Sequence, residues 1–433
     1  MAELRRILTP LMVWGLGVGY VISGNYFGWN LGLAAGGTGG LAIATLGAIV
    51  LYVTFTYSYA ELACAIPKAG GAFDYAFRAW GPDFGFVTGM AQNVEFVFAP
   101  PAIAFGIGSY IGLFFPWINP LVGSVVVYAL FTGLNLLGIR VAASFELIVT
   151  VIAVTGLLVF ASFLLPAVKW ANLTINAWPQ SYGGIVAAIP YAAWFFLGIE
   201  GVANLAEETV NPNRTMSVGF LAALFTLVCV CTLTFISAVG VGGWEAVVLQ
   251  ADGTTSDAPL PMAVSKVMGD GHPLYYVMAA VGVVGLVASL NGLVLAAGRS
   301  TLEFGKLTAP YSVFSRIGTR SQAPTGALIA NFFVGLLALL TGRTGEIIIL
   351  SVLGALSLYA LSMLAMMRLR WKEPELHRPF LTPGFPVFPI IAFILALVAW
   401  ISVAWHHPIL CLIYCLIIAG CFGIFRLRTL RHS

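Results

Sequence analysis

The sequence predicts an all-α membrane protein that crosses the bilayer about twelve times. Three observations support this fold class. Of the 433 residues, 60% are hydrophobic and only 9% are charged, which is far from the composition of a soluble domain. Apolar stretches of the roughly 20 residues that span a bilayer recur along the chain. The basic residues, finally, fall almost entirely into alternate connecting segments.

The twelve spans follow one another with short polar connections. The first apolar run continues without a small-residue cleavage site, so no cleavable signal is expected. The one long outer connection, residues 243–272, is expected to be a solvated connector that could partly cover an external vestibule. The predicted spans are 10–36, 38–63, 83–113, 119–138, 143–166, 182–207, 216–242, 273–300, 323–342, 346–369, 386–404 and 408–426.

The basic residues predict the orientation. If both termini are cytoplasmic, all but three of the 20 lysines and arginines lie on the inner side, the exceptions being Lys169, Lys266 and Arg343. This positive-inside bias favours an even number of spans in the inner or plasma membrane, with both termini in the cytoplasm. The inner basic residues are expected to face lipid head groups, so no nucleic-acid partner is expected.

The sequence contains no pattern typical of a metal site, a disulfide framework or an enzyme. The six cysteines lie in or at the ends of apolar segments, and the five histidines are scattered, with no CxxC motif. No paired His/Asp/Glu cluster, nucleophile motif or phosphate loop is visible, which argues against a membrane enzyme. We therefore expect no cofactor.

Two spans have polar or glycine-rich interruptions. The stretch "VISGNYFGWN" (21–30) places Ser23, Gly24 and Asn25 inside the first span, and "FFLGIEG" (195–201) interrupts the sixth. Non-helical backbone at membrane depth is tolerated only where it lines a cavity or is buried in protein. Two broken helices five spans apart are typical of inverted-repeat transporters that bind substrate at the midplane. The alternative is that the glycines only allow close helix packing.

Three motifs give the chain a family resemblance. "SYAELACAIPKAGGAFDYAFRAWGP" (58–82), "FFLGIEGVANLAEETVNPNRTMSVG" (195–219) and "RPFLTPGFP" (378–386) resemble signatures of the amino acid–polyamine–organocation superfamily. "VISGNYFGWNLGL" in the first span is similar to that of its ethanolamine permeases. The resemblance implies a five-plus-five inverted repeat with broken helices 1 and 6. The implied transporter domain covers 1–426, with repeats at about 10–166 and 182–369, two further helices at about 386–426, and a cytoplasmic tail at 427–433.

The first break suggests a substrate without a carboxylate. Amino acid carriers of the superfamily typically have Gly-x-Gly there, and its amides cradle the substrate carboxylate. In this chain Ile22 takes the place of the first glycine, and only Gly24 remains. A β-branched residue restricts the backbone and hinders close approach. Asn25 adds a donor and an acceptor, so ethanolamine, with its ammonium and hydroxyl, is the expected substrate.

Two acidic residues are the main candidates for binding the ammonium group. Glu95 lies near the middle of the third span, where a carboxylate is costly and faces the protein interior. It either contacts substrate or bonds neighbouring helices. Glu200 lies at the start of the second half of the sixth span, where the helix dipole favours its ionised form. Its expected role is gating, proton coupling or capping of the helix.

Nearby aromatic side chains could attract the ammonium by about 0.5–2 kcal/mol. Ser289 and Asn291 in the eighth span could bind solute or an ion, although interhelical hydrogen bonds are their commoner use. Glu95 and Glu200 are the expected coupling or gating residues. The expected substrate-binding set is Ser23, Gly24, Asn25, Tyr26, Glu95, Trp194, Phe196, Gly198, Glu200, Ser289 and Asn291.

The sequence does not decide the coupling ion, and three alternative functions have to be compared with amine import. The fifth span lacks the lysine of some proton-coupled relatives, so coupling could use a proton at Glu95 or Glu200, sodium at Ser289, or no ion at all. Glu146, near the inner end of that span, is expected to be a structural partner. An amino acid carrier is the alternative to an amine importer by alternating access. A channel lacks support because a broken-helix pair indicates one central site, and a non-transporting sensor of the same fold would lack flux.

Three further glutamates lie at the inner ends of helices. We expect Glu61, Glu207 and Glu208 to pair with basic residues close to them in the sequence, namely Lys68, Arg78 or Arg214.

Overall fold

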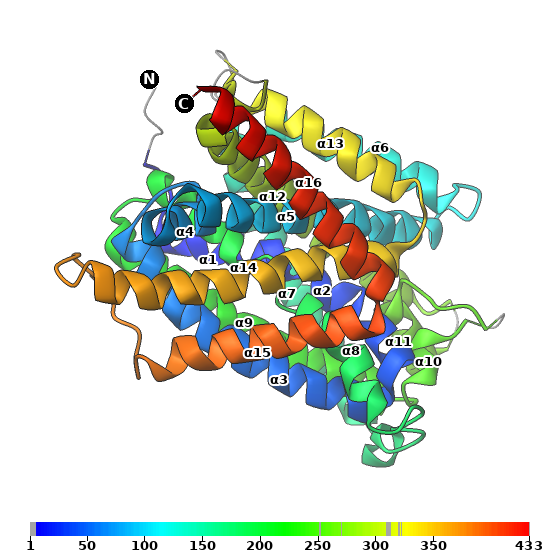
Figure 1. Cartoon of the computed structure of the whole chain (residues 1–433). Coiled ribbons are helices and arrows are strands. Elements are labelled where there is room, and N and C mark those ends of the chain that lie inside the picture. Colours follow the sequence, from blue (N-terminus) through cyan, green and yellow to red (C-terminus); the bar gives the residue numbers. More distant parts are fainter. Residues whose placement is uncertain are drawn as a thin grey trace.

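The computed structural model shows long helices running side by side through one compact bundle (Figure 1). It describes residues 6–250, 253–269, 271–308, 313–318, 321 and 323–432, without the side chains of 139–143, 307–308 and 428–432. Within these ranges the only β-structure is two isolated bridges. The chain is therefore an all-α polytopic membrane protein, as predicted.

The helices and short 3₁₀ segments follow one another with brief connections. In chain order they are α1 (Pro10–Val21), α2 (Ser23–Tyr26), α3 (Trp29–Ala65), α4 (Ala72–Trp80), α5 (Pro82–Gly112), α6 (Pro120–Leu136), α7 (Ile139–Leu164), η1 (Leu165–Ala167), η2 (Trp170–Leu173), α8 (Gly183–Trp194), η3 (Ile199–Glu208), α9 (Pro212–Gly240), α10 (Glu245–Val248), α11 (Pro259–Met268), α12 (Pro273–Thr308), η4 (Val313–Ser315), α13 (Thr325–Leu339), α14 (Thr344–Lys372), α15 (Val387–His406) and α16 (Pro408–His432).

Every predicted span is helical in the structure. Some spans are one helix or part of one, and the interrupted spans consist of shorter helical segments. Nine helical segments of the described residues are long and apolar enough to cross a membrane, and three shorter apolar helices complete the set. The first span consists of α1, α2 and the start of α3. It ends at Gly37, whose φ of 67° separates it from the second span within α3. Helices α12 and α14 run past the predicted span ends, because a helix continues into the polar interface where the apolar run stops.

The first break lies slightly later than predicted. Ser23, Gly24 and Asn25 belong to the short helix α2, and the backbone leaves the helical region at Phe27 (φ −160°) and Gly28 (φ 89°). Gly28 is required there, because a side chain at this positive φ would be strained and would run into the Trp194 indole. The prediction of a break at Ser23–Asn25 is therefore wrong by about two residues for the backbone.

The sixth span is interrupted where predicted. Helix α8 ends at Trp194, the next residues form turns, and Gly198 adopts a left-handed conformation with φ 99°. The second half is the 3₁₀ helix η3 rather than an α-helix. Its opening residues, Ile199 and Glu200, are fully buried.

The helix contacts follow the expected five-plus-five pattern. The third span (α5) packs on the tenth (α14), and the eighth (α12) packs on the fifth (α7). In the same way α8 of the sixth span packs on the second, and α1 of the first packs on the seventh (α9). Exchanging each of spans 1–5 with its counterpart among spans 6–10 converts one contact of each pair into the other, as an inverted repeat requires. Helices α15 and α16 lie outside this core (Figure 1).

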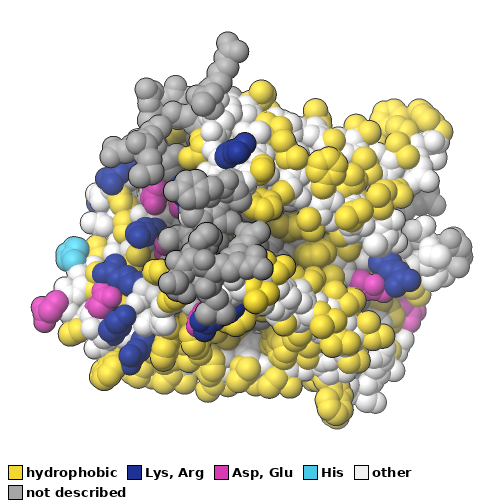
Figure 2. Space-filling view, turned by 45° about the horizontal axis from the view of Figure 1, so that its top comes forward, with side chains coloured by type: hydrophobic (Ala, Val, Ile, Leu, Met, Phe, Trp, Pro, Cys, Tyr) yellow, Lys and Arg dark blue, Asp and Glu magenta, His cyan; other side chains and the backbone are white. Residues whose placement is uncertain are grey.

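One end of the bundle carries most of the charge. The N-terminal segment and the end of α16 lie at the same end (Figure 1), and Figure 2 shows basic side chains gathered mainly at one end of an otherwise apolar surface. At this end Arg78 pairs with Glu373, and Lys372 donates to the Arg78 carbonyl. The arrangement agrees with an even number of spans, and the assignment of this end to the cytoplasm stays a prediction.

The predicted ion pairs at this end are wrong. Glu61 binds Arg370 (Nε to Oε1, 2.7 Å) and lies 3.4 Å from Arg378, and Glu208 pairs with Arg299. Glu207 accepts a hydrogen bond from the Ala69 amide, between α3 and α4. The actual partners lie on helices that the fold brings alongside, far away in the sequence.

The described part of the connection 243–272 packs against the bundle and is not merely a solvated connector. Within it, Leu260, Ala263 and Val264 of α11 are buried. The Asn30 amide donates to the Ser256 carbonyl at 2.5 Å, which joins the loop to the first span. Burial raises the pKa of Asp257 in this loop to about 6.

Candidate functional site

Ser289 of α12 is bonded into the first span just before its break. Its hydroxyl accepts a hydrogen bond from the Ser23 amide (2.9 Å) and donates to the Gly19 carbonyl (2.6 Å). These two backbone groups are four residues apart and would bond each other in a regular helix. The hydroxyl therefore opens the hydrogen-bond ladder and satisfies both buried groups.

The two broken spans touch each other directly. The α-carbon of Gly24 packs so closely on the Trp194 carbonyl that no larger side chain fits there. The Trp194 indole donates to the Phe27 carbonyl at 3.1 Å, and its ring meets Phe27 edge-on at 6.1 Å. Gly24 and Trp194 thus hold the two breaks together, and the indole N–H is already used.

Tyr26 anchors the first break to its neighbours. Its hydroxyl donates to the Ala153 carbonyl on α7 at 2.7 Å, and its carbonyl accepts from the Tyr110 hydroxyl at 2.7 Å. Both polar ends of Tyr26 are occupied by protein partners.

Two carboxyl groups meet beside the second break. Glu95 of α5 and Glu200 of η3 are fully buried and lie against each other, close to the Gly198 amide. Neither Glu95 oxygen has a hydrogen-bond partner with good geometry. The Tyr359 hydroxyl donates to Glu200 Oε2 at 2.8 Å, and Oε1 has no partner.

Aromatic rings border this pair of acids. Phe196 lies 5.2 Å from the Tyr52 ring, and the Tyr52 hydroxyl lies 3.1 Å from that of Tyr359. Tyr52 and Tyr359 were absent from the sequence prediction. They lie in apolar spans of a chain that is 13% aromatic, so they do not stand out in the sequence. The one signal that could have identified them is a hydroxyl group on a helix face that is expected to be buried.

Two further buried side chains at the first break have polar atoms without partners, namely Trp29, through its indole N–H, and Asn25. Asn25 is fully buried, and both its oxygen and its nitrogen lack a hydrogen bond. Buried polar groups are usually satisfied, so an unpaired amide beside a helix break is a candidate for binding a polar ligand.

Asn291 lies in a separate network. Its amide donates to Glu146 Oε2 at 2.8 Å, and its oxygen accepts from the Asn135 amide at 3.1 Å. These are interhelical hydrogen bonds between α12, α7 and α6. The structure thus brings Glu95, Glu200, Gly198 and Phe196 towards one another and leaves Asn291 with other partners.

The paired acids suit a cation. Two carboxyl groups in contact in a buried site either share a proton, so that only one is ionised, or hold a cation between two carboxylates. Within the described ranges, no three His, Cys, Asp or Glu residues are grouped so that they could hold a metal ion. An organic ammonium fits the chemistry of the pair, because it donates up to three hydrogen bonds to acceptor oxygens.

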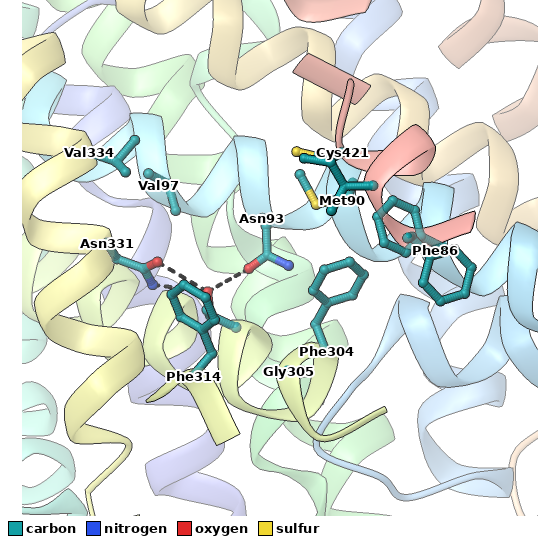
Figure 3. A pocket seen from close by; sticks show the side chains of 13 residues that line it. Phe86, Met90, Asn93, Val97, Phe304, Gly305, Phe314, Asn331, Val334 and Cys421 are labelled. Atoms are coloured by element: carbon teal, nitrogen blue, oxygen red, sulfur yellow. Dashed lines mark hydrogen bonds between the residues drawn. The ribbon is translucent and has the colours of Figure 1, made fainter. Parts of the chain in front are cut away.

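A separate pocket opens to the surface between α5, α12, α13 and α16. It has a volume of about 430 Å³ and a mostly apolar lining. Figure 3 shows Asn93 and Asn331 linked by hydrogen bonds at this pocket; the bridging group is the Thr301 hydroxyl, which donates to Asn93 at 2.6 Å and accepts from Asn331 at 3.0 Å. Because its polar atoms are satisfied by one another, this pocket suits lipid chains better than a polar solute.

The fold and the broken-helix site define a transporter of the permease class, not an enzyme. Residues 8–425 match the amino acid permease family, and the chain belongs to that family.

Several curated transporters are similar along the chain. An uncharacterized transporter of Rhizobium meliloti is 27% identical over 413 residues, covering 93% of this chain and 87% of the relative. The branched-chain amino acid permease BcaP of Bacillus subtilis is 25% identical over 453 residues, covering 96% and 92%. The low-affinity putrescine importer PlaP of Escherichia coli is 27% identical over 232 residues, about half of each chain. The relatives therefore include carriers named for amino acids and for an amine.

Proposed function

We propose that this permease is a secondary active transporter that imports a small amine lacking a carboxylate, with ethanolamine as the expected substrate, across the plasma membrane by alternating access. The observation that carries the proposal is the contact between the buried carboxyl groups of Glu95 and Glu200. Three of their four oxygens lack a good hydrogen bond, so the pair offers acceptors and negative charge to an ammonium.

The first break offers few amides to a carboxylate. The amides of Ile22, Ser23, Asn25, Phe27 and Gly28 donate to Val18, Ser289, Ile22, Ser23 and Asn30 respectively. A carboxylate cradled here would have to displace those bonds. It would also lie near two acidic side chains, where like charges repel. The unpaired Asn25 amide is proposed to bind the substrate hydroxyl.

An amino acid substrate is the second candidate. It is favoured by the similarity to BcaP, which covers 96% of this chain. An amino acid carries the same ammonium, so Glu95 and Glu200 alone do not separate the two candidates. The difference is the carboxylate.

Uptake by purified protein in liposomes tests the proposal. Labelled ethanolamine should accumulate, and other small amino alcohols should compete better than alanine, serine or leucine. Protein-free liposomes are the control for passive entry. Competition by the amino acids as strong as that by the amino alcohols would favour the second candidate, and absence of flux with every substrate would favour a sensor.

A further inference from the structure

Glu146 is a buried acid that the proposed substrate site does not use. It lies on α7 with no exposed surface, and Asn291 donates to its Oε2 at 2.8 Å. Its Oε1 has no hydrogen-bond partner. Asn291 is in turn held by Asn135, so spans four, five and eight position this carboxyl group.

The carboxyl group touches the first span close to its break. Glu146 Oε1 and the Thr150 hydroxyl pack directly on the α-carbon of Gly19, leaving no space for a side chain there. The carbonyl of Gly19 is the one that bonds the Ser289 hydroxyl, which also holds the Ser23 amide. Any change of charge at Glu146 therefore acts on the turn where the first span opens.

Among the described residues, no basic side chain forms an ion pair with Glu146. The titratable group facing it from α1 is Tyr20, whose hydroxyl has no partner. Beyond Tyr20 lie Glu208 of η3 and Arg299 of α12, which are buried and paired with each other. From α12 and α6 the polar groups are the amides of Asn291 and Asn135, which are neutral.

An ionised carboxylate in this place would be expensive. Burying a charge without an ionic partner costs several kcal/mol, and a carboxyl group inside a membrane protein commonly marks an ion or proton pathway. The burial of Glu146 and its unpaired Oε1 favour a neutral carboxylic acid in the arrangement seen here. A state that admits water to Glu146 allows the proton to leave.

We infer that Glu146 is a proton-binding site, separate from the substrate site, and that its protonation is required to close the transporter around the substrate. A proton taken up by the Glu146 carboxylate from the outer side is released to water on the inner side when the bundle opens there. One proton then enters with each closing cycle, and uptake is driven by a pH gradient. This inference rests on the proposed transport function, in which the substrate cation binds elsewhere, at Glu95 and Glu200.

The test separates coupling from transport. In liposomes, wild-type protein should accumulate ethanolamine when the outside is more acidic, with potassium replacing sodium on both sides. Glu146→Gln keeps an acceptor for Asn291 and cannot release a proton. It should still exchange labelled for unlabelled ethanolamine, and its uptake should stop at equal concentrations inside and outside. Thr150→Val is the matched control, since it removes the hydroxyl group that lies against the same glycine and donates to the Gly15 carbonyl, and it should keep pH-driven accumulation.

Three results would overturn the inference: full pH-driven accumulation by Glu146→Gln, loss of it in Thr150→Val as well, or accumulation by wild-type protein that needs sodium. If the wild-type protein does not exchange ethanolamine, the proposed substrate is wrong, and the proton site has to be tested without substrate. Acidifying the wild-type protein should increase the infrared carbonyl absorption of protonated carboxyl groups, to which every buried acid contributes. The acid-induced difference spectrum of Glu146→Gln should lack one component of this absorption, and that of an outer-end control, Glu346→Gln, should retain it; a difference spectrum unchanged in Glu146→Gln would refute the site.

Discussion

Replacing Glu95 by glutamine should weaken ethanolamine binding more than the loss of one neutral hydrogen bond would. Both oxygens of Glu95 are buried and have no hydrogen bond of good geometry in the free protein, so an ammonium there can take the place of a proton shared with Glu200. Hydrogen bonds to charged groups contribute about 1.5–3 kcal/mol, against ~1 kcal/mol for neutral ones. The difference is close to ~1.4 kcal/mol, so affinity should fall about tenfold.

Equilibrium titration of the purified variants measures this effect. Glu346→Gln is the control, because Glu346 is exposed and pairs with Arg343 at the far end of the bundle. Glu200→Gln should slow transport more than it weakens binding, since Glu200 opens the half-helix η3 that would move as a gate. If Glu95→Gln binds normally and Glu200→Gln does not, the ammonium site belongs to the sixth span alone and our assignment is wrong.

Three further predictions concern stability. Tyr359→Phe removes the one donor to Glu200 and should lower the melting temperature without ligand; saturating ethanolamine should reduce that deficit, and an equal deficit in both conditions would contradict a cation at the acids. Ser289→Ala removes both hydrogen bonds of the bridging hydroxyl and should cost about 1–3 kcal/mol of unfolding free energy, so an unchanged melting curve would refute its bridging role. Burial raises the pKa of Asp257 from 3.8 to about 6, so the folded state binds this proton more tightly than the unfolded chain. The stability that protonation adds is present at low pH and is lost as pH rises through this interval. Asp257→Asn should therefore melt higher than wild type above about pH 6, and identical pH profiles would count against this.

The sequence predicted the elements better than their contacts. Apolar run length and basic-residue distribution are local signals, and they located the spans and both interrupted helices. The first break was placed two residues early because Ser23 and Asn25 look like breakers, whereas Gly28 is the residue with positive φ. The ladder at Ser23 does open, through a hydroxyl 266 residues away that no local pattern reveals.

The candidate site was predicted in part for the same reason. A glutamate inside a span is conspicuous, so Glu95 and Glu200 were both selected, but their mutual contact depends on how α5 packs beside η3. Tyr359 is one aromatic residue among many in the sequence. Glu146 was expected to be a structural partner, and its hydrogen bond to Asn291 agrees with that; its unpaired oxygen became visible only once the neighbouring helices were in place.

The most direct test of the proposed substrate class compares ethanolamine with serine, because serine has the same ammonium and hydroxyl groups plus a carboxylate. Binding of each to the purified protein can be measured by calorimetry at one pH and ionic strength. An unpaired buried charge costs several kcal/mol, so serine should bind at least ~100-fold more weakly, at ~1.4 kcal/mol per factor of ten. Serine binding as tight as ethanolamine would contradict the account and assign the permease to amino acids.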